Sequence, residues 1–474
     1  MNRRLVVSAS LVAALAACTV GPDYHRPQVE APAAWRTPAS DAADVANIAW
    51  WEQFQDPALS ALVVEAVRNS KDLAIATARV EQAYAQYGIT RSAQLPQADA
   101  SAAAARERGS RNTPTSASAG HEYFNDVTTG LSLGYEIDLW GRLRRATEAA
   151  RADLLASEEG RRTVLMTLVS TVASGYVQLR ALDRQLVIAR QTSRSLDEAA
   201  LLQLVRFREG ARPESDYQQA EAQAQSAAGQ VSEIERQIAR QENFLSALVG
   251  RNPGPIARGR DIEALAFPVV PAALPASLLE RRPDVRQAEQ NLVAANADVG
   301  IARAAYFPRI SLTAVFGFES TDLADLLKSA SRRGRLGLDA TVPVFTAGRI
   351  GNQVKQAEAL RREALSGYEK SILLALQDVE NALADRVKFG EERAVQAKNV
   401  EALARFRDLA ALRYREGATI YLEVANAEQS LFGAQLAYVA IQAQLFQTYA
   451  NLYKAMGGGW DAQIDPMAAT QARP

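Results

Sequence analysis

The chain has 474 residues and a formal net charge of −1, so no basic excess indicates nucleic acid as a partner. A single cysteine excludes a disulfide within the chain, and two histidines leave little material for a zinc site, a cysteine nucleophile or a histidine-centred triad. Hydrophobic residues make up 48% of the chain and aromatic residues 7%, which is typical of a helix-rich protein with a large core. We therefore expect a mainly α protein that is not an enzyme and holds no metal.

The N-terminus has the layout of a bacterial lipoprotein signal. Two arginines precede an apolar run over residues 5–17 that is too short to span a bilayer as a permanent helix. The run ends in Leu-Ala-Ala-Cys, which matches a lipobox, where the signal is cleaved and a cysteine takes diacylglycerol. We predict that residues 1–17 are removed and that Cys18 carries a covalent lipid, with no other cofactor. An ordinary signal peptide with an incidental cysteine is the alternative, and Thr19 favours sorting to the outer membrane.

The rest of the chain repeats itself once. Residues 72–96 match residues 284–308, and residues 206–211 match residues 413–418. A match over this distance indicates an internal duplication rather than a short solenoid repeat. The predicted organisation is an N-terminal extended segment and linker (18–57), a first structural repeat (58–265), a second structural repeat (266–460) and a C-terminal tail (461–474).

Each repeat contains a predicted hairpin of strands. Mainly apolar residues occupy the odd positions from 127 to 139 and polar residues or glycine the even ones, which is the period of a strand with one apolar face. The second repeat alternates in the same way from 336 to 344. The four predicted strands cover residues 97–107, 123–140, 309–319 and 334–345.

The alternation assigns the two faces of these strands. The residues expected to meet lipid are Leu131, Leu133, Leu336 and Leu338. The residues expected to face water are Ser132, Glu136, Asp138 and Asp339, and the three carboxylates are candidates for lining a lumen. Long strands with one apolar and one polar face suit an outer-membrane barrel. A half-buried sheet in a soluble α+β domain is the alternative.

The remaining sequence is helix-like. Two stretches of about 65 residues, 142–207 and 349–414, would each form a helix about 100 Å long, which requires a coiled-coil-like assembly. Gly210 and Gly417 stand where helices should reverse direction. The shorter predicted helices cover residues 58–94, 216–248, 283–305 and 422–455.

The strand count predicts an oligomer. Four strands cannot close a barrel, because about eight is the practical minimum. Several copies must therefore share one barrel, with the long helices bundled into a hollow cylinder that continues it. The strand count alone does not determine the number of copies.

Several segments are together highly specific for one family. They are Cys18–Pro27, Trp50–Pro57, Tyr135–Arg142, Leu278–Asp284, Ala304–Arg309 and Leu452–Trp460. With them the chain resembles the outer-membrane factors of the TolC superfamily, and most closely the OprM-like lipoprotein branch that serves resistance-nodulation-division (RND) efflux pumps. The resemblance covers essentially the whole mature chain.

The resemblance implies a homotrimer with a twelve-stranded barrel above a long periplasmic α-helical tunnel, in the outer membrane of a Gram-negative bacterium. It implies a periplasmic adaptor (a membrane fusion protein) and an inner-membrane RND transporter as partners, and the export of small compounds. A type I secretion conduit for protein export is one alternative. A coiled-coil envelope lipoprotein without a pore is another.

The resemblance also places a periplasmic gate after the two glycine turns. Tyr414 matches a tyrosine that ties the closed state, Glu423 matches an acidic ring and Leu422 an apolar constriction. Asp216 matches an acidic gate position in the first repeat. Asn426 stands where the family usually has Asp, which weakens the case for a second acidic ring. Helix capping and turn chemistry are the alternative explanation for these residues.

Overall fold

The computed structural model describes residues 19–30, 32–37, 49–108, 123–269 and 281–458. The signal peptide (1–17), the lipid site at Cys18 and the tail (461–474) lie outside the described residues. The chain divides into two compact units, each built from segments of both halves of the sequence. The first unit comprises Met1–Gln28, Arg79–Glu158 and Gln287–Glu369, and the second comprises Val29–Ala78, Glu159–Arg286 and Lys370–Pro474.

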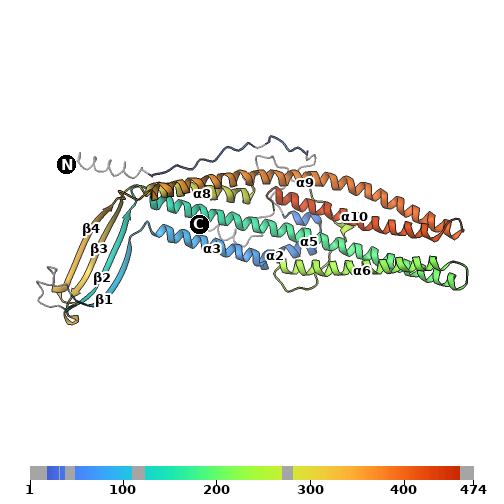
Figure 1. Ribbon diagram of the computed structural model, residues 1–474, viewed down its shortest axis with the longest axis horizontal. Coiled ribbons are helices and arrows are strands. Elements are labelled where there is room, and N and C mark those ends of the chain that lie inside the picture. The colour runs from blue at the N-terminus through green and yellow to red at the C-terminus, as the bar shows by residue number, and fades with distance from the viewer. Residues whose placement is uncertain (1–18, 31, 38–48, 109–122, 270–280, 459–474) are drawn as a thin grey trace. The chain divides into compact units, whose positions relative to one another are not determined.

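A four-stranded antiparallel sheet is the main feature of the first unit (Figure 1). Its strands, in spatial and chain order, are β1 (Gln97–Arg108), β2 (Tyr123–Ile137), β3 (Arg309–Ser320) and β4 (Arg332–Thr341). The prediction of four strands is therefore confirmed. Two of them end earlier than predicted, β2 because the amide of Leu139 bonds back to the Ile137 carbonyl and Gly141 has a positive φ of 77°.

The pairing register gives the sheet one apolar and one charged face. Residues opposite one another in antiparallel strands share a face. One cross-strand row is Ala98, Leu133, Ala314 and Leu336, and the next is Ala100, Leu131 and Phe316. The other face is mainly polar: one of its rows is Asp99, Ser132, Val315 and Arg335, and another is Glu136, Ser311 and Asp339. The apolar face is open within the chain, since Leu336 is 78% exposed and Leu131 59%.

Two short 3-10 turns, η4 (Leu323–Asp325) and η5 (Ser329–Ser331), join β3 to β4. Four helices contribute residues to both units: α3 (Lys71–Ser92), α5 (Arg142–Arg208), α8 (Pro283–Ala304) and α9 (Arg349–Arg415). In the first unit α5 and α8 pack through small side chains, Ala149 and Ala152 against Ala294 and Ala297. Small residues at such a seam let helix backbones approach closely.

The second unit contains the largest hydrophobic core. It adds η1 (Trp50–Phe54), α2 (Pro57–Asn69), α6 (Glu214–Leu248), η2 (Ile262–Ala264) and α10 (Tyr421–Ala455) to the shared helices. Trp50 stacks on Tyr453 with ring centroids 5.2 Å apart. Asp56 caps α2 by accepting the amide of Ala58, and its other oxygen accepts the hydroxyl of the buried Tyr176. These contacts explain the first Trp and the Asp of the Trp-Trp-Glu-Gln-Phe-Gln-Asp-Pro sequence.

The single helix predicted over residues 58–94 is wrong, because the chain breaks at Ser70. Ser70 has ψ 129°, outside the helical range, and is 4% exposed. Its amide bonds to the Ala66 carbonyl at the end of α2, and its carbonyl accepts the amide of Ala74 in α3. The turn at Gly250 packs against the backbone of Asn69 at this break.

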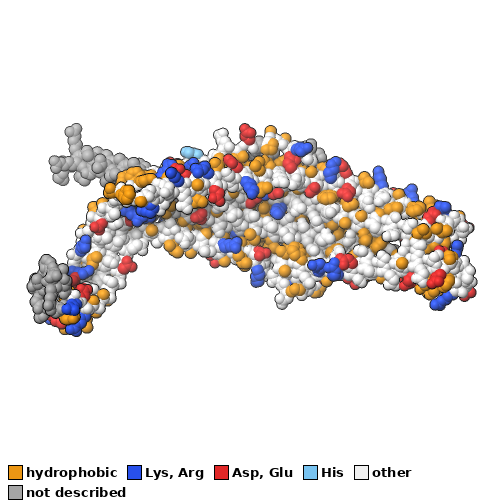
Figure 2. Space-filling model, in the orientation of Figure 1, with side chains coloured by type: hydrophobic (Ala, Val, Ile, Leu, Met, Phe, Trp, Pro, Cys, Tyr) orange, Lys and Arg blue, Asp and Glu red, His pale blue; other side chains and the backbone are white. Residues whose placement is uncertain are grey.

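The helices and strands show the duplication directly. Both α5 and α9 have 67 residues, α6 and α10 have 35, α3 and α8 have 22, and β1 and β3 have 12. Acidic and basic side chains are interspersed over the helices on the visible face (Figure 2). Among the described residues, none of the helices has the length and apolar character needed to cross a bilayer.

Candidate functional site

Two glycine turns reverse the long helices of the second unit. Gly210 joins α5 to α6 and Gly417 joins α9 to α10, and both have φ of 73°. The amide of Ala211 bonds to the Arg206 carbonyl, and the amide of Ala418 bonds to the Arg413 carbonyl, each at 2.8 Å. Such bonds close a helix with a glycine in the left-handed conformation, so these positions favour glycine.

The α5–α6 pair and the α9–α10 pair each form a helical hairpin. Near the glycine turns, Tyr414 lies at the centre of the contact between these two hairpins. Its ring is 6% exposed, and its hydroxyl donates to Gln203 Oε1 at 3.0 Å and accepts from Arg206 at 3.3 Å. The guanidinium groups of Arg206 and Arg212 lie 5.6 and 5.0 Å from the ring centroid, within cation–π range. Tyr421 meets the ring edge-on at 5.5 Å.

The sequence did not identify Gln203, Arg206 or Arg212 as partners of Tyr414. Arg206 belongs to a repeated Arg-x-Arg-Glu-Gly sequence, which is visible in the chain, but the repeat does not indicate a contact with the other hairpin. Within the chain, Tyr414 of α9 bonds to Gln203 and Arg206 of α5, and its role in a gate stays a prediction.

The carboxylate of Glu423 forms an ion pair within its own hairpin. It pairs with Arg413 at 2.7 Å and accepts the hydroxyl of Thr419, and its side chain is 25% exposed. Asp216 lies in the first turn of α6. Burial raises the pKa of Tyr421 to about 12, and the nearby acidic groups Tyr414, Glu428 and Asp216, in that order, add to this shift.

Asn426 and Leu422 have different surroundings on α10. Asn426 lines a cavity of about 610 Å³ between α5, α6 and α10, together with Gln223, Gln429 and Phe432. Leu422 is 42% exposed, so within one chain its side chain has little cover. These positions leave Leu422 available for a contact outside the chain, whereas Asn426 contributes to the seam between helices.

Two of the three carboxylates predicted to line a lumen have partners at the junction of β2 and α5, and the third has a partner within the sheet. Glu136 accepts two hydrogen bonds from Arg142, at 3.0 and 2.8 Å, and Asp138 accepts the amide of Arg144 at 2.9 Å. Asp339 accepts the hydroxyl of Thr313 at 3.4 Å across the charged face of the sheet. Their role in a lumen stays a prediction.

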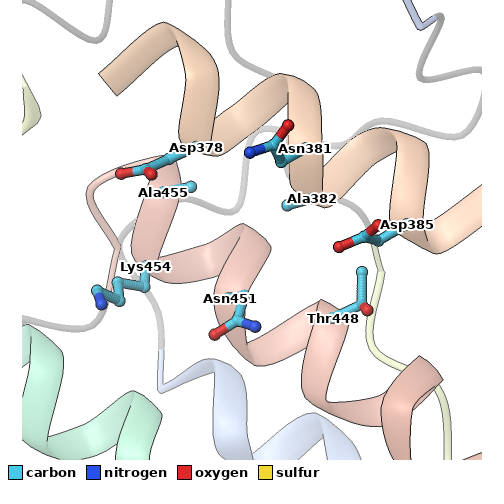
Figure 3. A pocket seen from close by; sticks show the side chains of 8 residues that line it. All are labelled: Asp378, Asn381, Ala382, Asp385, Thr448, Asn451, Lys454 and Ala455. Carbon is cyan, nitrogen blue, oxygen red and sulfur yellow. The ribbon is translucent and has the colours of Figure 1, made fainter. Parts of the chain in front are cut away.

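A second cavity, of about 200 Å³, lies between α9 and α10 and is lined mainly by polar side chains (Figure 3). Asp385 of α9 lies near Thr448 of α10 at one end of this cavity, and Asp378 of α9 lies near Ala455 of α10 at the other. Asp378 also pairs with Arg282, whose side chain is 5% exposed. Within the described residues no group of three or more His, Cys, Asp or Glu side chains could hold a metal ion.

A sheet with an exposed apolar face, combined with helices of 67 residues that end in turned-back hairpins, defines an outer-membrane channel subunit. The chain belongs to the outer membrane efflux protein family, whose sequence model matches residues 62–251 and 274–458. The predicted family and fold class are confirmed. The chain is an outer-membrane efflux channel of the RND type.

Relatives of known identity match almost the full length of the chain. The probable efflux pump outer membrane protein TtgC of Pseudomonas putida is 33% identical over 470 residues, covering 98% of this chain and 97% of the relative. The pyoverdine export outer membrane protein OpmQ of Pseudomonas aeruginosa is 33% identical over 473 residues, covering 99% of both.

Solved structures match equally well. The outer-membrane channel OprN has a TM-score of 0.85 at 30% identity, with 94% of this chain and 100% of that chain covered. The CmeC outer membrane channel of Campylobacter jejuni has a TM-score of 0.86 at 28% identity, with 94% and 96% covered.

Proposed function

We propose that the protein is a lipid-anchored homotrimer that forms the outer-membrane channel of a tripartite efflux system. In this proposal a periplasmic adaptor and an inner-membrane RND transporter deliver small compounds to a helical tunnel, which leads to a twelve-stranded barrel. The protein acts as a conduit and performs no catalysis. The relatives support efflux of organic compounds, since they include a toluene and a solvent efflux protein and a pyoverdine exporter.

The observation that carries the proposal is the open sheet. Among the described residues, β1 and β4 are edge strands, each hydrogen-bonded to only one neighbour. Edge strands with free backbone groups are costly in a bilayer unless they are paired. Because the four strands alternate in direction, β4 of one copy and β1 of the next would pair antiparallel, and three copies close a barrel of twelve strands.

The experiment measures stoichiometry and conduction on the same purified protein. Native mass spectrometry in detergent should give three copies, and planar bilayers should show discrete channels. Deletion of the gene should raise accumulation of a fluorescent efflux substrate and leave secreted proteins unchanged. A stable monomer without conductance would overturn the proposal, and loss of a secreted protein would favour the type I secretion alternative.

A further inference from the structure

The segment that follows the lipobox is extended and makes contacts throughout its length. It comprises residues 19–26, and it belongs to the first unit. It forms no helix or strand, so its position depends on contacts with other parts of that unit. In Figure 1 it is the dark blue trace that begins near the end of the sheet and continues along α8 and α9.

Its first half contacts the start of α5, in the first repeat. The amide of Val20 donates to the Trp140 carbonyl at 3.0 Å, and the Thr19 side chain lies against Gly141. Asp23 accepts from Arg145 at 2.6 Å. Arg145 is only 5% exposed, so it depends on this carboxylate and on that of its helix neighbour Glu148.

Its second half contacts α8 and α9, in the second repeat. The Asn296 side chain, which is 4% exposed, donates to the Pro22 carbonyl at 2.9 Å. Tyr24 donates to Glu289 at 3.1 Å, and Arg26 pairs with the same carboxylate at 3.1 Å. Arg26 also donates to the Tyr368 hydroxyl at 3.4 Å.

Gly21 permits the closest approach between this segment and α8. It has a φ of 108°, and a Cβ at this position would lie 2.4 Å from the Cα of Gly300. Any other residue would be strained in this conformation and would push the segment away from α8. The glycine pair therefore sets the depth at which the segment docks.

We propose that residues 19–26 are a brace that joins the two repeats at the end of the sheet. The brace supplies a partner to two nearly buried polar side chains, one from each repeat. Without it Arg145 would keep only the carboxylate of Glu148, and the Asn296 amide would lose the Pro22 carbonyl. It acts as part of the folded unit and not as a loose tether between the membrane and the protein.

The brace also fixes where a lipid would be attached, and this step rests on the proposed lipidation. Thr19, the first described residue, lies against Gly141, so a lipid on the preceding residue would be attached one Cα–Cα step, about 3.8 Å, before this contact. Trp140, next to Gly141, stacks on Phe307 at the end of β2. Acyl chains on Cys18 would therefore enter the bilayer beside the junction of β2 and α5.

The test is chymotrypsin cleavage after Tyr24 in the full-length lipoprotein, followed by mass spectrometry of the released peptide. Cleavage tracks the open population of the segment. The wild type should be cut far more slowly than the denatured protein. Gly21→Ala should be cut about tenfold faster than the wild type or more. Gly88→Ala is the matched control, because a Cβ there meets nothing within 4 Å, and it should behave like the wild type.

Cleavage of the wild type at the denatured rate, or equal rates for Gly21→Ala and the wild type, would overturn the brace. Thermal unfolding gives a second readout, in which Gly21→Ala should lower the midpoint relative to Gly88→Ala. The mass of the released peptide reports separately whether Cys18 is acylated. An unmodified peptide would refute the lipid anchor. The cleavage rates would still test the brace independently.

Discussion

Removal of the Tyr414 hydroxyl is the sharpest test of the gate. Tyr414→Phe keeps the ring and both cation–π contacts, and it deletes the hydrogen bonds to Gln203 and from Arg206. Gln203 is 2% exposed, so its carbonyl would remain buried without this partner. Leaving a buried acceptor unsatisfied costs about 1–3 kcal/mol. We therefore expect Tyr414→Phe to loosen the contact between the two hairpins by about that free energy in each chain.

A larger substitution gives a graded comparison. Tyr414→Leu also removes the cation–π contacts with Arg206 and Arg212, each worth about 0.5–1 kcal/mol or more when shielded from water. It further removes the edge-on contact with Tyr421, worth about 0.5–1.5 kcal/mol. The effect of Tyr414→Leu should therefore exceed that of Tyr414→Phe by about the sum of these terms.

Single-channel conductance in planar bilayers and thermal unfolding in detergent measure the two consequences. Both Tyr414 variants should conduct more than the wild type and unfold at lower temperature. Phe207→Leu is the matched control, because Phe207 occupies the equivalent position of the first repeat and is 36% exposed. If Tyr414→Phe changed conductance and unfolding no more than Phe207→Leu does, the gate would not depend on this contact.

Four further predictions concern the faces of the sheet, the tip, the core and alkaline pH. Leu131→Arg should cost about 2–4 kcal/mol of folding free energy in lipid, and Ser132→Arg on the opposite face little, as measured by urea unfolding in vesicles. Glu423→Gln should reduce cation selectivity and divalent block in bilayers, since it removes a carboxylate near the tip, and unchanged reversal potentials would contradict this. Arg282→Ala should cost about 1–3 kcal/mol in thermal unfolding, because it removes the buried donor to the Ala455 carbonyl and to the partly exposed carboxylates of Asp284 and Asp378, with Arg282→Lys as the milder control. Because the pKa of Tyr421 is raised from 10.0 to about 12, the unfolded tyrosine ionises first, so the contribution of Tyr421 to stability should be fully present below pH 10 and be lost between pH 10 and 12. Tyr421→Phe should reduce that loss in an alkaline titration.

Local sequence patterns determined much of this protein. Period-2 alternation predicted the strands and their faces, because successive side chains on a strand point to opposite sides whatever lies around them. The long helices and their reversals at Gly210 and Gly417 were predicted for a similar reason, since helix propensity and the left-handed turn are properties of a few neighbouring residues. The helix break at Ser70 was not predicted, because the residues around it do not signal a break. The structure packs this point against the turn at Gly250, 180 residues further along the chain.

Only the tertiary structure decided which side chains meet. Arg206 and Arg413 are equivalent in the two repeats, yet Arg206 binds Tyr414 of the other hairpin and Arg413 pairs with Glu423 of its own. The same sequence therefore makes different contacts, because the partners depend on which helix faces pack together. The brace is another example of contacts that the sequence did not predict, since nothing in the sequence indicates that Asp23 and Arg145 form an ion pair. Local chemistry specifies helices, strands and turns, whereas ion pairs between distant segments depend on the packing that brings them together.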